Sequence, residues 1–370
     1  MPDRTLRTVH VDAERGFSGG EVQVFLLLEG LRARGHQVLL VAPPASRAGE
    51  EARRRGIECA AVPMRSDADL CAVWRLSRLF RQSGADLVHL HTGRATWLGG
   101  LAAAWAGIPA ITTRRMDRPV RRNARNRLVY RRLVRRVAAI SGPVAELLRE
   151  GGVPPERIEL IHSAVDVPRP PTPDGRRRLR AELGAGADDV VLLVLATLVA
   201  RKGIDVLLRA LGGLTDLPHV VLWIAGEGPE REALERLAAE LGVAPRARFL
   251  GRREDAQALL AACDVYCLPS RREGLGVSAL EALASARPVV ASRVGGLAEA
   301  VEDGRTGLLV APDDAAALCD ALRRLAADPD LRLRLGAAGP RSLERGYLTA
   351  QMVGRYEDLY RRVLAEGQVA

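Results

Sequence analysis

The chain has 370 residues, of which 48% are hydrophobic and 27% charged, and its formal net charge is +10. This length suits two domains better than one, and the hydrophobic content is sufficient for two cores. A membrane-spanning helix is excluded because it needs roughly 20 apolar residues, whereas the longest apolar run, at 190–199, is as short as a strand.

The start of the chain and its cysteines bear on the cellular compartment. The residues from Met1 to Arg7 lead directly into a strand-like run, so we expect no secretory signal and a cytoplasmic location. The cysteines are odd in number and scattered, and no histidine pair lies near them at zinc-ligand spacing. We therefore expect buried free thiols at Cys59, Cys71, Cys263, Cys267 and Cys319.

In the first half of the chain, short apolar runs alternate with helical patterns. Helices are predicted between the strands, for example at 20–34 and 69–82. The predicted strands cover residues 7–12, 37–42, 58–63, 86–91, 110–113, 137–140 and 158–162. Then follows the segment 167–175, whose four prolines predict an extended hinge rather than a helix.

The second half repeats the alternation, with strands predicted at 190–196, 220–226, 247–250, 264–269, 289–291 and 308–310. Alternating strands and helices build parallel sheets covered by helices on both faces. The predicted fold class is therefore α/β, with two Rossmann-like domains whose parallel sheets face each other across a cleft. Ligands bind such sheets at the carboxyl ends of the strands.

The predicted domain boundaries follow from this pattern. An N-terminal domain covers 1–168, a Pro-rich linker and lead-in 169–188, and a C-terminal domain 189–349. The last segment, 350–370, is predicted to form a helix. Its apolar stripe must pack against another element and consists of Met352, Tyr356, Leu359, Tyr360 and Val363.

The most informative segment is the glycine loop that follows the strand at 264–269. Glu273 begins this loop, Gly274 and Gly276 allow a ligand to approach the backbone closely, and Glu281 lies on the helix that follows. The free N–H groups at the start of that helix favour an anion. The segment thus offers a phosphate seat and two carboxylates for sugar hydroxyls. The alternative is a structural glycine turn with two solvated glutamates.

This segment resembles the donor-site signature of retaining glycosyltransferases of family 4, which have the GT-B fold. Their pattern is E-G-x-G-x-x-x-L-E, followed by P-V-V-A and G-G, and the chain matches it in order from Glu273 to Gly296. The resemblance extends from about residue 8 to 345. It implies that the final helix crosses back onto the N-terminal domain.

The resemblance also implies roles for the donor-side residues. Glu281 would hold the ribose hydroxyls and Glu273 the sugar. Arg201 and Lys202, after the first strand of the second domain, would hold the diphosphate and stabilise its growing charge. The other phosphate contacts would come from the backbone of Gly274, Leu275, Gly276 and Val277. The family often has an arginine where this chain has Thr197, so Arg201 is expected to supply that charge.

Two further glycine pairs match the family more weakly. Gly226 and Gly228 resemble its G-x-G-P segment, which lines the nucleoside pocket, although a purely structural turn fits as well. Gly19 and Gly20 resemble a loop that faces the donor phosphates, although a simple glycine turn fits here too. No D-x-D motif is evident, and family members generally need no metal.

On the acceptor side, His91 matches the histidine of the family's H-x-H motif, which approaches the transferred sugar. Imidazole can hydrogen-bond a hydroxyl and can change charge near pH 7, so His91 is a predicted catalytic residue. His89 lies on the same face of the strand and is predicted to be a core residue. The loop from Thr112 to Pro119 resembles an R-R-x-D-x-P stretch of family members linked to bacterial cell-surface glycans.

Residues 114–136 contain eleven arginines and one acid, Asp117. A planar guanidinium binds phosphate with paired hydrogen bonds, so we expect a phosphorylated or lipid-linked acceptor, or peripheral contact with an anionic membrane. A solvated helix face is the alternative. Nucleic acid is not expected, because aromatic residues that stack on bases are few.

The sequence thus predicts a retaining glycosyltransferase that uses a UDP- or GDP-sugar as substrate and needs no further cofactor. Its acceptor would be a glycan, glycolipid or other hydroxyl compound, as in lipopolysaccharide or capsule biosynthesis. Transfer to a soluble small molecule, a different sugar-nucleotide reaction on the same fold, and a non-catalytic nucleotide-sugar or nucleic-acid binding module are the alternatives. The intact Glu273 and Glu281 pair argues against the last of these.

Overall fold

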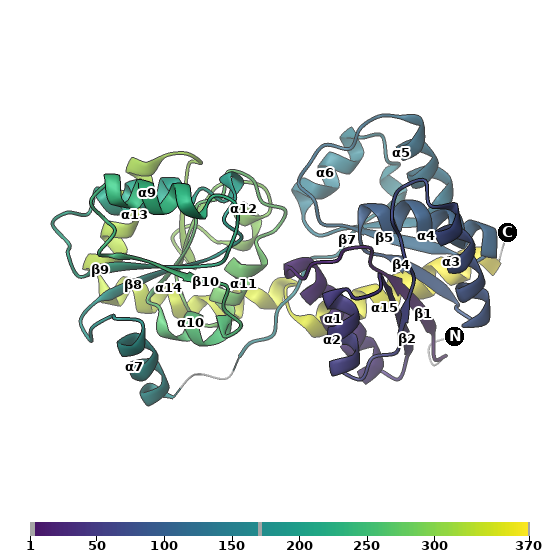
Figure 1. Cartoon of the computed structure of the whole chain (residues 1–370), viewed down its shortest axis with the longest axis horizontal. Coiled ribbons are helices and arrows are strands. Elements are labelled where there is room, and N and C mark those ends of the chain that lie inside the picture. The colour runs from purple at the N-terminus through teal and green to yellow at the C-terminus, as the bar shows by residue number, and fades with distance from the viewer. Residues whose placement is uncertain (1–3, 169–171, 369–370) are drawn as a thin grey trace. The chain divides into compact units, whose positions relative to one another are not determined.

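The computed structural model describes residues 4–168 and 172–368, which form two compact units (Figure 1). Unit 1 contains the described residues up to Ala164 and those from Thr349 onward, whereas unit 2 runs from Val165 to Leu348. Each unit is built around one parallel sheet, so the predicted α/β class with two Rossmann-like domains is confirmed. No helix among the described residues is long and apolar enough to cross a membrane.

Unit 1 has a seven-stranded sheet in the order β3-β2-β1-β4-β5-β6-β7, and every neighbouring pair is parallel. Its strands are β1 (Arg7–Val11), β2 (Gln37–Ala42), β3 (Cys59–Ala61), β4 (Leu87–Leu90), β5 (Ala110–Arg114), β6 (Arg136–Ala139) and β7 (Ile158–Leu160). Its helices are α1 (Gly19–Ala33), α2 (Arg47–Arg54), α3 (Leu70–Gln82), α4 (Gly93–Ala106), α5 (Ala124–Leu128), the π-helical η1 (Val129–Leu133), α6 (Gly142–Glu150), η2 (Pro155–Arg157) and α15 (Thr349–Gln368).

Unit 2 has a six-stranded parallel sheet in the order β10-β9-β8-β11-β12-β13. Its strands are β8 (Val190–Leu195), β9 (Val220–Ala225), β10 (Ala247–Gly251), β11 (Val265–Leu268), β12 (Val289–Ser292) and β13 (Gly307–Val310). Its helices are α7 (Pro173–Glu182), η3 (Ala200–Lys202), α8 (Ile204–Gly212), α9 (Arg231–Glu240), α10 (Ala256–Ala262), α11 (Val277–Ala284), α12 (Leu297–Ala300), α13 (Ala315–Ala327), α14 (Pro329–Ser342) and η4 (Leu343–Arg345).

The strand order reverses once in each sheet, between β1 and β4 in unit 1 and between β8 and β11 in unit 2. At such a reversal the chain leaves the two neighbouring strands in opposite directions, so the loops diverge and leave room for a ligand at the carboxyl edge. His91 and Thr92 follow β4, and the segment from Ser270 to Glu273 follows β11. The residues singled out in the sequence are therefore positioned by the two reversals.

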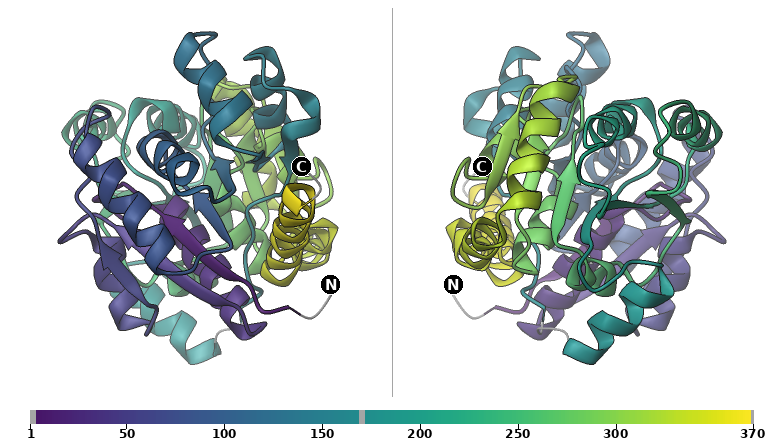
Figure 2. Two further views of the ribbon diagram at one scale, coloured as in Figure 1. Left: turned by 90° about the vertical axis from the view of Figure 1, so that its right-hand side faces the viewer. Right: turned by 90° about the vertical axis from the view of Figure 1, so that its left-hand side faces the viewer.

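The last helix, α15, completes the core of unit 1 although it is the last element of the chain. Met352, Tyr356, Leu359, Tyr360 and Val363 are all buried in one cluster with residues of α1 and of the sheet. Figure 2 (left) shows α15 in yellow beside the strands of this unit. The predicted apolar stripe is thus confirmed as the buried face of the helix.

The Pro-rich segment is not extended throughout, contrary to the sequence prediction for 167–175. Residues 169–171 lie outside the described part of the chain, but α7 begins at Pro173 with Thr172 as its N-cap. Proline is tolerated in the first turn of a helix because its missing N–H would have no partner there. Arg180 then fixes α7 to the sheet, since its buried guanidinium bonds Asp264 at 2.9 Å.

The cysteine prediction is only partly correct. All five thiols are free, and Cys263 and Cys267 are buried in unit 2. Cys71, however, is exposed on α3, while Cys59 and Cys319 are half-buried. The burial of a thiol depends on which face of its helix or strand the cysteine occupies. The composition of the sequence does not reveal that face.

Candidate active site

The donor-side residues of unit 2 meet where β8 and β11 end. The Lys202 ammonium forms an ion pair with the Glu273 carboxylate at 2.5 Å, and their side chains are only 11% and 12% exposed. The Ser270 hydroxyl donates a hydrogen bond of 3.2 Å to the same carboxylate oxygen. The structure therefore brings together two predicted site residues that are 71 positions apart in the chain, and it adds Ser270, to which the sequence analysis gave no role.

Arg271 holds this arrangement together. Its guanidinium bonds both oxygens of Asp205 at 2.9 and 2.7 Å and the Asp313 carboxylate at 2.6 Å. Its backbone N–H donates to the carbonyl of Arg201 at 2.8 Å. Because Asp205 lies on α8 and Arg201 on η3, Arg271 ties the loop after β11 to the loop after β8. The sequence did not predict this link between the two loops, since Arg271 and Asp205 are far apart in the chain.

The glycine loop brings the backbone of α11 close to neighbouring segments. Gly276 is the N-cap of α11 with φ +83°, and no side chain caps the helix. A Cβ at Gly276 would lie 2.4 Å from Leu297, and one at Gly295 would lie 2.0 Å from the carbonyl oxygen of Glu273. These glycines are therefore required by close packing, and the uncapped helix start leaves amide groups that favour an anion.

Glu281 lies on α11 and is largely enclosed. Burial raises its pKa to about 7, because a charged carboxylate is less stable away from water. Within residues 4–168 and 172–368, its carboxyl group forms no hydrogen bond or ion pair, in contrast to that of Glu273. A carboxyl group without a protein partner is well suited to accept hydrogen bonds from ligand hydroxyls.

The remaining donor-side predictions differ in their surroundings. Arg201 and Thr197 are exposed. Leu275 is buried, and Val277 begins α11. Gly226 and Gly228 pack tightly against the backbone. A Cβ at Gly226 would lie 1.8 Å from the Ala196 carbonyl oxygen, and one at Gly228 would lie 2.3 Å from that of Leu198. Close backbone packing accounts for both glycines, and a role in the nucleoside pocket stays a prediction.

Unit 1 contains a pocket of about 720 Å³ at the carboxyl edge of its sheet. Asp12, His91 and Thr92 line it from the ends of β1 and β4, Arg94 and Arg125 from α4 and α5, and Arg121 from the loop before α5. Asp67 pairs with Arg94 at 3.8 Å and with Arg125 at 2.6 Å. Gly20 also lines the pocket, but Gly19 and Gly20 form the first turn of α1, which Ser18 caps, rather than a free loop.

The arginines of this pocket are not all balanced by acids. Arg114, Arg115 and Arg121 form no ion pair within the described residues, and the Nε atoms of Arg114 and Arg115 are buried without a hydrogen-bond partner. A second pocket of about 270 Å³ adjoins the first through Arg121, Asn123, Asn126 and Tyr130. Arg122, Arg127 and Arg131 line it as well, and no carboxylate does. The second pocket therefore favours an anion, whereas the first also contains the acids Asp12, Glu14, Glu21 and Asp67.

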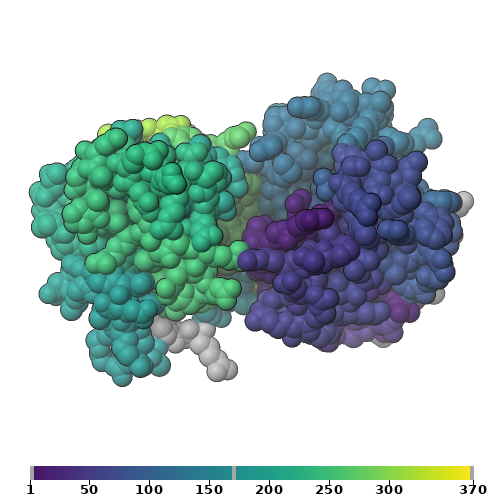
Figure 3. Space-filling model, viewed as in Figure 1, coloured from purple at the N-terminus to yellow at the C-terminus, as the bar shows by residue number. Residues whose placement is uncertain are grey.

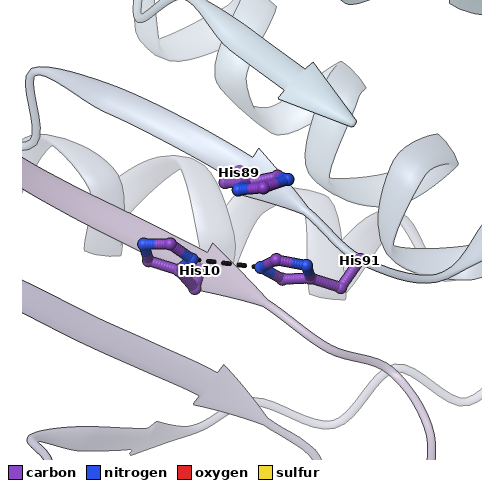
Figure 4. A group of neighbouring side chains, drawn as sticks. All are labelled: His10, His89 and His91. Atoms are coloured by element: carbon purple, nitrogen blue, oxygen red, sulfur yellow. Dashed lines mark hydrogen bonds between the residues drawn. The ribbon is translucent and has the colours of Figure 1, made fainter. Parts of the chain in front are cut away.

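His91 belongs to a buried group of three histidines (Figure 4). His10 Nδ1 and His91 Nε2 are 3.0 Å apart, and the ring of His89 lies over that of His91 with centroids 4.0 Å apart. His89 bonds the Tyr360 hydroxyl at 2.6 Å and the Thr113 hydroxyl at 2.7 Å. One ring nitrogen from each of the three histidines lies within 4.8 Å of the others, and hydrogen bonds and ring contacts join the rings to Tyr360 and Thr113 in one buried network.

The charge state predicted for His91 is wrong. Burial holds its pKa well below the usual value near 6.5, and the neighbouring His89 and Arg115 lower the pKa further. The ring is therefore neutral near pH 7 and does not change charge there. Asp12 shows the opposite effect, since burial raises its pKa to about 7. His89 is fully buried, as predicted for a core residue.

Comparison with known proteins decides the family. The profile for Glycosyl transferases group 1 matches residues 175–342, and that for Glycosyltransferase Family 4 matches residues 17–169. The lipopolysaccharide core biosynthesis glycosyltransferase LpsD of Rhizobium meliloti is 32% identical over 295 residues, which cover 79% of this chain and 80% of LpsD. The chain belongs to glycosyltransferase family 4. The family predicted from the glycine loop is thus confirmed.

Two other similarities concern a further relative and the fold. D-inositol 3-phosphate glycosyltransferase of Streptomyces scabiei is 34% identical over 281 residues, but these cover 68% of this family 4 chain and only 63% of that relative. The crystal structure of HepE from Anabaena in complex with UDP and glucose superposes with a TM-score of 0.86 at 21% identity, covering 96% of this chain and 99% of HepE. This structural likeness shows the GT-B fold.

The raised pKa of Glu281 predicts a pH-dependent effect of Glu281→Gln on stability. Between the unfolded pKa near 4.5 and the folded pKa near 7, the folded state retains a proton that the unfolded state releases. The contribution of this group to the free energy of unfolding of the wild type is therefore fully present below pH 4.5, and it is lost as the pH rises through 7. The variant should gain stability relative to wild type over this window, on the order of 3 kcal/mol in total.

Urea unfolding at pH 5 and pH 8 measures this difference. Glu240→Gln, at the exposed end of α9, controls for the loss of one carboxylate. A difference between wild type and Glu281→Gln that stays constant with pH would show that the buried carboxyl group is not the cause.

Proposed function

We propose that the chain transfers a sugar from a nucleotide-diphosphate sugar to a hydroxyl group, with retention of the anomeric configuration. The observation that carries this proposal is the Lys202–Glu273 ion pair beside the uncapped start of α11, with the carboxyl group of Glu281 left free. The pair offers a cation for the diphosphate and a carboxylate for the sugar. The complex of HepE with UDP and glucose supports the choice of donor class.

The proposed roles follow from charge. The amide groups at the start of α11 and the Lys202 ammonium hold the diphosphate. Their interactions with it become stronger as negative charge grows on the leaving group. Glu273 contacts the sugar, and Glu281 accepts hydrogen bonds from the ribose hydroxyls. Arg201 is exposed and free to reach the phosphates. The acceptor attacks on the face from which the diphosphate departs, and the leaving phosphate takes the proton.

For the acceptor we propose a glycan, a lipid-linked compound or a phosphorylated hydroxyl compound. The support is the pair of adjoining pockets in unit 1, where several arginines have no acidic partner. The relatives whose names include lipopolysaccharide core and D-inositol 3-phosphate fit this class. We place the enzyme in the cytoplasm, with peripheral contact at the membrane when its acceptor is lipid-linked.

Lys202→Ala is the direct test of the donor site. Turnover should fall by roughly 10²–10³, because the cation stabilises charge that develops mainly in the transition state. The affinity for the donor should fall much less. Steady-state kinetics with UDP-, GDP- and ADP-sugars, combined with calorimetric titration, separates these effects.

Arg209→Ala provides the control, since Arg209 is an exposed cation on α8 outside the donor-side cluster. The double variant Lys202→Ala/Glu273→Gln tests whether an unpaired Glu273 is the cause of the loss. An increase in KM with unchanged kcat would reduce Lys202 to a binding residue.

The arginine-lined second pocket generates a prediction about membranes. The triple variant Arg122→Gln/Arg127→Gln/Arg131→Gln should bind anionic vesicles about 100-fold more weakly, because each basic residue near an anionic surface contributes about 1 kcal/mol. High salt should abolish the binding of the wild-type protein by screening. Figure 3 shows the segment around these residues, in blue, at the surface of unit 1.

Co-sedimentation with vesicles of phosphatidylcholine alone, or mixed with phosphatidylglycerol, measures this effect. Arg47→Gln/Arg53→Gln/Arg75→Gln removes the same charge from exposed positions elsewhere in unit 1 and serves as the control. Equal losses in the two triple variants would assign the effect to net charge alone. Equal partition of the wild type to both vesicles would contradict the membrane proposal.

A further inference from the structure

A row of polar side chains leads through β1 to His91. Thr8 and His10 lie two residues apart on this strand and are completely buried. The Thr8 hydroxyl oxygen is 3.0 Å from His10 Nε2, and His10 Nδ1 is 3.0 Å from His91 Nε2. Figure 4 shows the rings of His10 and His91 joined edge to edge by this hydrogen bond. The other ring nitrogen of His91, Nδ1, is buried and has no partner.

The rings in this row are neutral. Burial lowers the pKa of His10 to about 3 and holds that of His91 well below its usual value. A neutral imidazole carries one N–H, so one nitrogen donates and the other accepts. The row thus contains three hydrogens, one each on Thr8, His10 and His91, for two hydrogen bonds.

Two proton arrangements satisfy both hydrogen bonds. In the first, the Thr8 hydroxyl donates to His10 Nε2, His10 Nδ1–H donates to His91 Nε2, and the proton of His91 is on Nδ1. In the second, all directions reverse, so the buried Thr8 hydroxyl hydrogen and the His91 Nδ1 lone pair are both unpaired. The first arrangement leaves one unpaired group and the second leaves two. Buried unpaired polar groups cost free energy, so the first is favoured.

We infer that Thr8 and His10 are positioning residues that hold His91 in the tautomer with its proton on Nδ1. His91 lines the pocket of unit 1, and in this tautomer its buried and unpartnered Nδ1–H is the hydrogen-bond donor that the ring has left for a ligand. The partner that fits is an oxygen atom of the ligand, such as a hydroxyl or phosphate oxygen. The identity of that ligand as a glycosyl acceptor rests on the proposed function, whereas the tautomer does not.

The other residues of the network fix the ring of His91 in place. His89 lies against it, and the two nitrogens of His89 are held by Tyr360 from α15 and by Thr113 from β5. Thr113 in turn bonds the Tyr356 hydroxyl at 2.8 Å. The helix at the end of the chain therefore supports a ring at the pocket wall, which gives the tyrosines of α15 a role besides core packing.

Nitrogen NMR of the protein labelled with ¹⁵N-histidine tests the inference, because protonated and unprotonated ring nitrogens have distinct shifts. The chain has only six histidines, so His10→Gln and His91→Gln variants can assign the signals. The wild-type spectrum at pH 7 should show the proton of His91 on Nδ1 and that of His10 on Nδ1. A proton on His91 Nε2 would overturn the inference.

Thr8→Val removes the hydroxyl that sets the direction, so the His91 signals should shift towards the Nε2–H form. Thr8→Ser keeps a hydroxyl and should restore the wild-type spectrum. Thr113→Val removes an equally buried hydroxyl that bonds His89, and it should leave the tautomer of His91 unchanged. A His91 spectrum that is identical in Thr8→Val and wild type would show that Thr8 does not position the ring.

Activity provides the second readout. Thr8→Val should lower kcat roughly tenfold, as expected for one misdirected hydrogen bond, while the affinity for the nucleotide sugar, which unit 2 would bind, stays unchanged. A changed tautomer with unchanged kcat would overturn the positioning role. If the wild-type protein transfers no sugar at all, the proposed function fails, and the NMR result still decides the tautomer.

Discussion

The reversal of strand order in two parallel sheets is the constraint on which the rest of this structure depends. Between β1 and β4, and again between β8 and β11, neighbouring strands send their chains in opposite directions. The carboxyl ends at these two points carry Asp12 and His91 in unit 1, and Lys202 and Glu273 just beyond the strands in unit 2. Helices and cores serve to hold these edges in place, because a parallel sheet is stable only when both faces are covered.

In unit 2 the site is held by charges that balance one another. Lys202 and Glu273 are poorly exposed and neutralise each other, and Arg271 fixes the two loops that carry them. Such a pair loses hydration on burial, so its net contribution to stability is small. Each group holds the other in place, and under the proposed function they would meet a diphosphate and a sugar, which need opposite charges. Glu281 differs because it is buried without a partner, which raises its pKa.

In unit 1, uncharged groups hold the side chains at the carboxyl edge of the sheet in place. Burial keeps His10, His89 and His91 neutral by lowering their pKa values, and hydroxyl groups from β1, β5 and α15 bond His10 and His89. The charge in this unit lies on arginines around the two pockets, several of which lack acidic partners. An acceptor that carries a phosphate would supply the missing negative charge, and a neutral hydroxyl compound would not. Under the proposed function, charge would select the acceptor, and neutral hydrogen bonds would orient its reacting hydroxyl.

Features that depend on short-range sequence patterns could be predicted from the sequence. Alternating apolar runs predicted every strand of the described residues, the stripe of α15 indicated its buried face, and the glycine loop indicated the family. Interactions between distant segments could not be predicted. The Arg271–Asp205 pair, the Lys202–Glu273 pair and the Thr8–His10–His91 row each depend on strand order, which a single sequence does not reveal. The neutral state of His91 was missed for the same reason, because burial depends on tertiary packing. Thr8 and His10 alternate with Val9 and Val11 in β1, and this is the signal that could have indicated the row.

The central claim is that the chain moves a sugar from a nucleotide-diphosphate sugar with retention. Proton NMR during incubation with α-linked UDP-, GDP- and ADP-sugars tests it most directly, with inositol phosphate or water as acceptor. The account predicts that one donor is consumed, that nucleoside diphosphate is released, and that the first product to form has the α configuration. Consumption of no donor, or a first product with the β configuration, would contradict it.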